Sequence, residues 1–143
     1  MKLEDYFKGS MDAHGLLMSR SGTVTRTFVV RMDMSWKDDL GTLKEDFKWN
    51  NGENTQRVWT VKILDDGKYE GTVPDIVGVA RGNSTEDGFH WKYLMKIATG
   101  NSSYKIRFDD RMHMINEKVI LNEAVMYWFG IRVGKIIISF QKP

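Results

Sequence analysis

Apolar and polar residues alternate along most of this chain, in ten runs that each end at a turn sequence. In the clearest run, residues 24–36, the even positions from Phe28 to Trp36 are apolar, whereas most odd positions are polar. A period of two residues is typical of a β-strand with one buried face and one face in water. Because ten such runs leave no room for a long helix, the pattern constrains the chain to an all-β fold.

The runs predict ten strands after one short amphipathic helix at residues 3–8. The strands are expected at residues 11–19, 24–37, 41–49, 55–64, 68–73, 76–83, 88–98, 103–113, 118–128 and 131–142. Pairs such as Asn51-Gly52 and Asp66-Gly67 fall between them and supply the positive φ angles of tight hairpins. Short links make consecutive strands antiparallel, and ten long strands in an open sheet would leave two exposed edges. We therefore expect an antiparallel up-and-down β-barrel.

Length and composition narrow the class of protein further. The chain has 143 residues, a net charge of +2 and no cysteine. This length suits one domain, residues 1–143, with a core of its own. Basic and acidic residues are interleaved along the strands, so no basic face predicts a nucleic-acid partner. The lack of cysteine excludes disulfides, thiolate metal sites and cysteine nucleophiles.

Neither a membrane-spanning helix nor a signal peptide is visible in the chain. No run of about 18 apolar residues is present, which is the length that a spanning helix needs. Residues 1–7 lack the apolar core of a signal peptide. From these residues alone, the protein is either cytoplasmic or has lost a leader.

Five charged residues share the apolar, inward phase of their strands. They are Arg26, Glu45, Arg57, Asp110 and Glu123. An isolated charge in a dry interior costs several kcal/mol, so these groups must be paired, hydrated or bound to a ligand. One interpretation is a water-containing cavity in which an arginine receives a carboxylate or phosphate. The alternative is an internal ion-pair network, or charges that lie near the barrel ends where water reaches them.

The first interpretation predicts a binding site inside the barrel. Arg57 would anchor the anionic group, with two carboxylates as counter-charges, two tyrosine hydroxyls as donors and aromatic rings as the apolar wall. The predicted site residues are Arg57, Glu45, Asp110, Tyr93, Tyr104, Trp59 and Trp91. A barrel of about eight to ten strands can enclose one small ligand, and such pockets are mostly apolar with a few polar groups. No cofactor and no metal site is predicted.

Catalytic patterns are weaker. Asp109 and Asp110 are neighbours in a strand and therefore face opposite sides. The three histidines, His14, His90 and His113, fall on three different strands without metal-ligand spacing. Asp109 or Asp110 acting with His113 remains the one enzymatic hypothesis, for a reaction on lipids, although spacing alone places no nucleophile beside a base.

Two short segments depart from plain alternation. Gly78 and Gly82 lie in phase along one strand, which indicates close backbone approach or sharp coiling. Residues 136–138 are three consecutive isoleucines, apolar on both faces. We expect this segment to pack beneath the amino-terminal helix, with a subunit contact as the alternative.

Many short motifs, in order and at matching spacing, resemble a bacterial family of predicted lipoproteins known as domain of unknown function 3833. The motifs are Arg20-Ser21-Gly22, Gly41-Thr42-Leu43, Glu45-Asp46-Phe47, Asn51-Gly52, Gln56-Arg57-Val58-Trp59, Tyr69-Glu70-Gly71-Thr72, Asp75-Ile76-Val77-Gly78, Trp91-Lys92-Tyr93, Phe108-Asp109-Asp110, Leu121-Asn122 and the segment from Gly130 to Gly134. The resemblance covers nearly the whole chain. It implies a lipocalin-like (calycin) barrel, but no reaction, since no activity is established for the family.

The resemblance also implies a compartment and a ligand class. Family members carry an export signal and a lipid-attachment cysteine ahead of the part matched here, which implies the periplasmic face of the cell envelope. Membrane contact is then expected through that anchor alone. Frequent genetic linkage to lipid-modifying enzymes such as cyclopropane fatty-acid synthases favours a fatty-acyl ligand. Two departures stand out: His14 replaces an expected tryptophan, and Arg111-Met112-His113 replaces Trp-Met-Tyr.

The sequence leaves two main hypotheses for the function, and the lipid-modifying enzyme is a third. The first is a non-enzymatic envelope barrel that binds a small amphipathic or fatty-acyl ligand. The second is a filled barrel without a ligand, serving as a structural or protein-interaction module of the envelope. An empty cavity inside the barrel favours the first.

Overall fold

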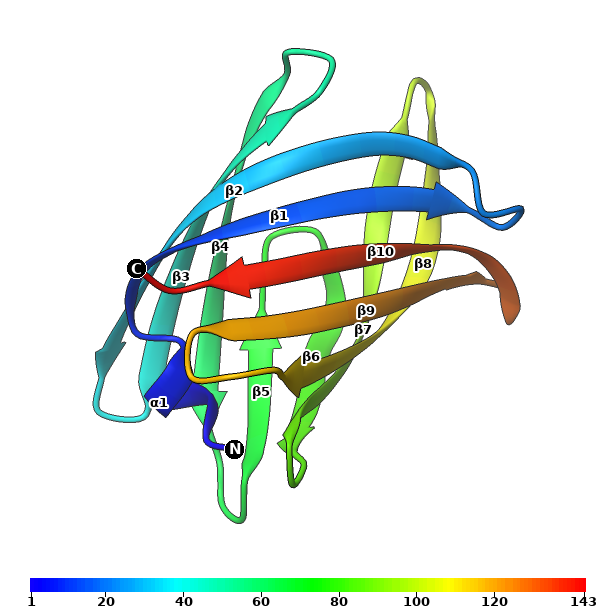
Figure 1. The fold of residues 1–143 in the computed structure, drawn as a ribbon. Coiled ribbons are helices and arrows are strands. Elements are labelled where there is room, and N and C mark those ends of the chain that lie inside the picture. Colours follow the sequence, from blue (N-terminus) through cyan, green and yellow to red (C-terminus); the bar gives the residue numbers. More distant parts are fainter.

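The computed structural model describes residues 1–143, apart from the side chain of Thr99. One short helix and ten strands follow one another in the order that the alternation predicts (Figure 1). They are α1 (Leu3–Tyr6), β1 (Gly9–Ser19), β2 (Val24–Lys37), β3 (Leu40–Trp49), β4 (Asn54–Ile63), β5 (Lys68–Thr72), β6 (Ile76–Ser84), β7 (Gly88–Thr99), β8 (Ser102–Met114), β9 (Val119–Trp128) and β10 (Ile131–Gln141). No described helix has both the length and the apolar character needed to cross a membrane.

Each strand pairs antiparallel with its neighbours in sequence, and β1 pairs with β10 to close the barrel. This confirms the predicted up-and-down meander. The register shifts at three places, between Leu17 and Met18, between Val77 and Arg81, and between Arg132 and Gly134. Elsewhere the ladders are regular, so residue parity decides which side chains face the interior.

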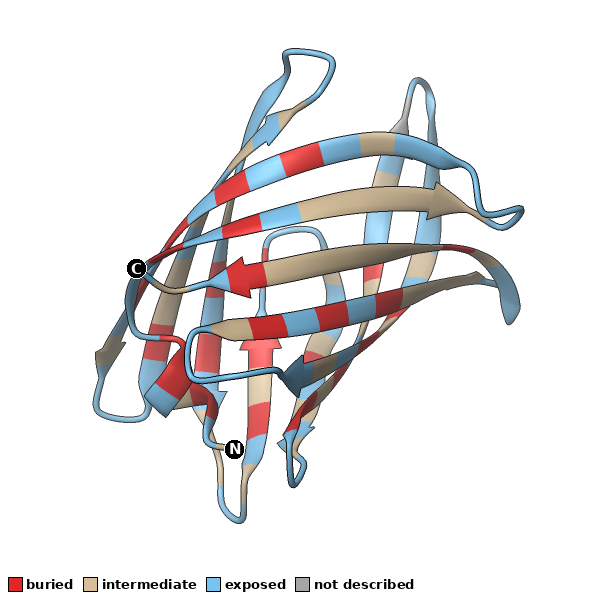
Figure 2. Cartoon of the chain, viewed as in Figure 1, coloured by how far each residue is buried: buried red, intermediate tan, exposed pale blue. Residues whose placement is uncertain are grey.

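Alternation sets the core. Along β2, Phe28, Val30, Met32 and Met34 are buried and their neighbours are exposed, as the banding in Figure 2 shows. Every second position of the strands therefore faces a common interior, and the polar positions face water. Side chains at the inward positions are the ones that can build a site.

One end of the barrel is closed by α1 and the residue that follows it. Leu3, Tyr6 and Phe7 are buried, and the Phe7 ring packs edge-on against Phe140. The Tyr6 hydroxyl lies 2.9 Å from the carbonyl oxygen of Lys118 and 3.1 Å from that of Phe140, and it can donate to either. The even-numbered strands β2 to β10 end here, whereas the opposite end carries only hairpin turns.

The two exceptions to alternation have separate explanations. Gly78, at φ +77°, lies within the irregular stretch of the β6–β7 pairing, which matches the predicted sharp coiling. Ile136 and Ile138 pack against the hydrophobic core cluster to which Leu3 and Tyr6 of the helix belong, and Tyr6 itself contacts β10 at the carbonyl of Phe140. Ile136 and Ile138 line the interior, and Ile137 faces outward opposite Leu16, half-buried on the surface.

Candidate functional site

The barrel encloses a cavity of about 720 Å³. It extends from Leu3 and Phe7 at the closed end to the turn residues Glu53 and Asp75 at the opposite, open end. Exposed residues line only its outer part, so the cavity reaches solvent through the open end. This volume falls within the roughly 300–1,000 Å³ that small-molecule sites occupy. The interior is not filled by side chains, which disfavours the filled-barrel hypothesis.

Arg57 of β4 lies half-buried in the cavity wall, as predicted. Its Nη2 atom is 3.4 Å from Oδ2 of Asp75, in the turn after β5, and its Nη1 atom is 3.8 Å from the Met95 sulfur. Asp75 was missed in the sequence because it follows a proline in a turn, where no periodicity marks it. A guanidinium has five N–H donors, and these two contacts do not use them all, so Arg57 keeps donors for a molecule in the cavity that it lines.

Glu45 of β3 lies directly opposite Arg57 in the ladder. Burial raises the pKa of its carboxyl to about 7, although the charge of Arg57 and a hydrogen bond from Trp59 oppose the rise. The predicted counter-charge is thus present, but near neutral pH it exists in both the protonated and the ionised form. A second anion beside it would favour the protonated form.

Asp110 of β8 lies deeper and is almost completely buried. Burial raises its pKa to about 7, while hydrogen bonds from Asn122 and Tyr93 favour the charged form. The Tyr93 hydroxyl lies 3.3 Å from Oδ2, and Asn122 Nδ2 lies 3.5 Å from the same atom. Burial and the charge of Asp110 also raise the pKa of Tyr93, so its hydroxyl stays a donor.

Two buried oxygens in this cluster have no hydrogen-bond partner among the described residues. They are Oδ1 of Asp110 and Oδ1 of Asn122. Buried acceptors without donors are costly, at about 1–3 kcal/mol each. Both residues line the cavity, so a bound molecule or water that offers N–H or O–H groups could satisfy them.

Glycines make room for the aromatic rings of the apolar cavity wall. Trp91 is buried, and its ring lies directly over Gly71 and Gly82, where an added Cβ would come within 2.5 Å and 2.1 Å of ring atoms. This confirms the close approach predicted at Gly82. Trp59 packs against Trp91 and edge-on against Tyr93, with ring centroids 6.0 and 5.3 Å apart. Trp59 and Trp91 therefore form an aromatic wall, as predicted, and Tyr93, which was predicted only as a hydroxyl donor, continues this wall.

Two inward predictions are wrong. Tyr104 lies in the same phase of β8 as the inward-facing residues, but it is close to the turn at which the strand begins. There it is 41% exposed, and its ring packs on Trp128 instead of lining the cavity. Glu123 of β9 faces outward, 3.7 Å from Lys135. Apolar residues occur at both the odd and the even positions of β9, so their number does not show which positions face the interior, and the odd positions were assigned wrongly. The inward phase holds Ile120, Asn122 and Ala124, and Asn122 was therefore missed.

Arg26, the remaining charge predicted to point inward, lines the cavity near the open end. Its guanidinium carbon lies 3.9 Å from the centre of the Trp49 ring, and Nη2 is 3.5 Å from Glu53. The open end thus has a cation and an aromatic ring of its own.

The histidines lie on the outer surface and make pairs other than the predicted one. His90 Nε2 is 2.6 Å from Asp109, and His113 Nδ1 is 3.2 Å from Asp87. Asp109 and Asp110 face opposite sides, as expected for neighbours in a strand. No three histidine or carboxylate side chains among the described residues gather in a way that could hold a metal ion.

The departures from the family pattern do not touch the cavity. His14, Arg111 and His113 are exposed, whereas Met112 between them lines the interior. The positions at which an aromatic residue was expected from the family resemblance are therefore on the outer surface.

Comparison with protein families gives a match over almost the whole chain. Residues 1–142 match the sequence profile of a family described as a protein of unknown function (DUF3833). The chain belongs to this family. No curated protein matches the chain.

Two solved structures resemble this DUF3833 protein in fold. The S-type phycobiliprotein lyase CPES from Guillardia theta superposes with a TM-score of 0.74 at 10% identity, covering 100% of this chain and 93% of the lyase. A de novo designed fluorescence-activating β-barrel gives a TM-score of 0.51 at 10% identity, covering 100% of this chain and 99% of the design. At this identity the likeness establishes the lipocalin-like barrel and nothing about chemistry.

Proposed function

We propose that this protein is a non-enzymatic binding barrel for one small amphipathic molecule with an acidic head group, such as a fatty acid. The observation that carries the proposal is the combination of an open cavity of about 720 Å³ with a partly free arginine in its wall. An apolar wall would hold the chain of the ligand, and Arg57 would hold the acid.

The polar cluster supports the assignment of an acid. Arg57 lies directly opposite Glu45 in the ladder, and the pKa values of the two buried carboxyls, Glu45 and Asp110, are both raised to about 7. Protonated Glu45 would donate a hydrogen bond to a ligand carboxylate instead of repelling it. The unpartnered oxygens of Asp110 and Asn122 would accept from ligand or water donors further in.

A catalytic role has a precedent in the fold, since one similar structure is a lyase. In this chain the close His–Asp pairs lie on the outer surface, away from the cavity. Among its described lining residues the cavity has no histidine, and the hydroxyl beside Asp110 is that of Tyr93, whose raised pKa keeps it protonated. We therefore favour binding over catalysis, and we place it in the cell envelope on the family resemblance.

Titration calorimetry with oleic acid and with oleyl alcohol tests the proposal, because the two differ only in the head group. The wild-type protein should bind the acid more tightly. Replacing Arg57 with Met should lower affinity for the acid about tenfold or more, the worth of one charged hydrogen bond. Binding of the alcohol should stay nearly unchanged.

The matched control is Arg31→Met, which removes an exposed arginine from the outer face of β2. It should change neither affinity. Equal affinity of the wild-type protein and Arg57→Met for the acid would contradict the role of Arg57. If Arg57→Met unfolds, Arg57→Lys keeps the charge and decides whether the arginine is structural.

A further inference from the structure

An exposed aromatic group lies outside the cavity, beside the open end. Phe129 in the β9–β10 turn is 86% exposed and Ile131, the first residue of β10, is 54% exposed, while Trp128 and Tyr104 are 39% and 41% exposed. The rings are in contact: Tyr104 and Trp128 have centroids 5.7 Å apart, and Trp128 and Phe129 5.0 Å apart. Contiguous apolar surface of this kind marks an interaction site more often than chance exposure.

The turn presents Phe129 at a conformational cost. Phe129 and Gly130 both have positive φ, 48° and 76°, as a two-residue hairpin turn requires. Asparagine or glycine is the residue that such a position favours, and a bulky ring there is uncommon. The sequence thus keeps an exposed phenylalanine where turn stability alone would favour a small polar residue.

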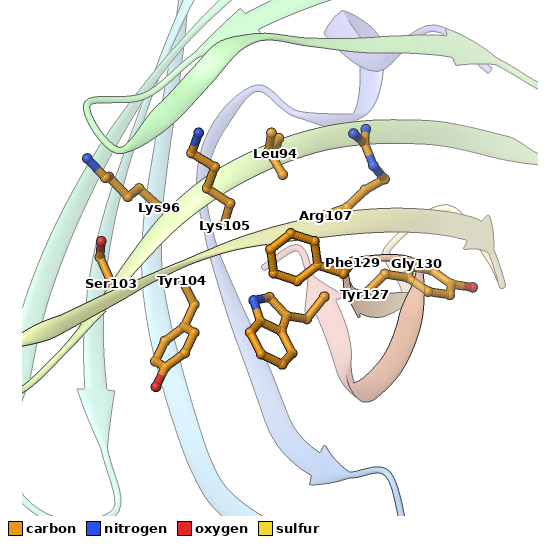
Figure 3. A pocket seen from close by; sticks show the side chains of 10 residues that line it. Leu94, Lys96, Ser103, Tyr104, Lys105, Arg107, Tyr127, Phe129 and Gly130 are labelled. Atoms are coloured by element: carbon orange, nitrogen blue, oxygen red, sulfur yellow. The ribbon is translucent and has the colours of Figure 1, made fainter.

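Cations surround this aromatic group. Lys96, Lys105 and Arg107 are exposed in the pocket of which Tyr104 and Phe129 form the other side (Figure 3). Lys96 and Lys105 are directly opposite in the β7–β8 ladder, an arrangement that destabilises a sheet. Among the described residues none of the three cations forms an ion pair, and no acidic side chain lines the pocket.

Arg132 extends the positive surface. It lies opposite Tyr127 in the β9–β10 ladder, and Tyr127 lies opposite Arg107 in the β8–β9 ladder. The outer faces of β7 to β10 near the open end therefore carry four cations, next to the exposed aromatic rings at the ends of the strands and in the β9–β10 turn. Rings that seat at the bilayer interface and cations that attract anionic head groups are the two features that bind a protein to such a surface.

We propose that this patch, consisting of Lys96, Tyr104, Lys105, Arg107, Trp128, Phe129, Ile131 and Arg132, docks the open end of the barrel on an anionic lipid bilayer. Phe129 and Trp128 enter the interface, and the cations contact head groups around them. The docking is separate from any lipid anchor. It stands on the patch alone and does not require the cavity to bind a ligand.

Sedimentation with vesicles tests the proposal, using phosphatidylcholine alone and phosphatidylcholine mixed with phosphatidylglycerol. The protein should sediment with the mixed vesicles and much less with phosphatidylcholine. Phe129→Asn should weaken this binding while the protein stays folded, because Asn-Gly suits the turn. Lys96→Glu combined with Lys105→Glu should weaken it by about fivefold or more for each cation removed.

The control for net charge is Lys37→Glu combined with Lys118→Glu, two exposed lysines at the closed end. This variant carries the same net charge as the test variant and should keep vesicle binding. An equal loss in both variants, or unchanged binding by a folded Phe129→Asn, would overturn the proposal. Preferential binding of a single-stranded oligonucleotide over mixed vesicles at the same salt concentration would overturn it too, since stacking on rings and cations also suits nucleic acid.

Discussion

The two ends of this barrel are built from the same alternating strands, yet they behave as opposites. At the closed end, Tyr6 and Phe7 are buried and hydrogen-bonded or packed against β10. At the open end, Trp128 and Phe129 are exposed, and charged residues line the outer part of the cavity. Aromatic residues at the closed end therefore stabilise the fold, whereas those at the open end are exposed and can contact another molecule.

The largest expected effect is a matched pair of phenylalanine truncations. Phe7→Ala should lower the free energy of unfolding by about 3–5 kcal/mol, because it removes a buried ring from the closed end. Phe129→Ala should change it by less than about 0.5 kcal/mol, because the ring is in solvent. Urea denaturation measures both, and comparable losses would abolish the contrast between the ends.

A smaller effect is expected in the pH dependence of stability, which should differ between a carboxyl deep in the cavity, Asp110, and one at the open end, Asp75. The pKa of Asp110 is about 7 in the fold but near 3.8 in an unstructured peptide, so between these values the folded state holds a proton that the unfolded chain has lost. Stability should therefore fall as pH rises across that window and then level off. A shift of one pKa unit corresponds to about 1.4 kcal/mol. Above pH 7 the free energy of unfolding of Asp110→Asn should therefore be higher than that of the wild type by roughly 2 kcal/mol or more.

The control is Asp75→Asn at the open end, where the carboxyl is mostly exposed. It should leave the pH dependence of stability unchanged. Glu45, whose pKa is also raised to about 7, should preserve part of the slope in both variants. Denaturation at pH 5 and pH 8 measures the difference, and a wild-type protein that gains stability between these values contradicts the assignment.

The smallest effect separates two tyrosines. Tyr6→Phe removes the hydroxyl that binds the Lys118 and Phe140 carbonyls, and should lower the free energy of unfolding by about 1–2 kcal/mol because the hydrogen bond to Phe140 is buried. Tyr104→Phe at the open end should cost nothing measurable. Thermal unfolding of the two variants in parallel is sufficient, and a loss at Tyr104 equal to that at Tyr6 would refute the distinction.

Most of the fold could be predicted from the sequence, because the polarity of each residue in a strand indicates whether its side chain faces the interior or the solvent. Residues 24–37 are an example, since the predicted range and the observed β2 coincide. The same parity placed Arg57, Glu45, Asp110 and the Trp59–Trp91 wall correctly in the interior. Where alternation is unambiguous, side-chain direction follows from the sequence alone.

The failures have equally local causes. In β9 both phases are apolar, so Glu123 was assigned inward and Asn122 was missed. Tyr104 has the correct parity but lies at a strand end, where the wall no longer covers it. Asp75 lies in a turn, and its contact with Arg57 depends on how two hairpins meet in space. The register of pairing and the position along the barrel axis are tertiary properties that periodicity does not contain.

Native mass spectrometry of the purified protein tests the central claim most directly, namely that the open cavity binds an amphipathic acid. The protein would be exposed to a membrane lipid extract, measured intact, and then extracted with solvent for lipid analysis. We expect a one-to-one adduct that is released as an acidic lipid and is absent from Arg57→Met but present in Arg31→Met. A mass that stays that of the protein alone after exposure to the extract would contradict the account.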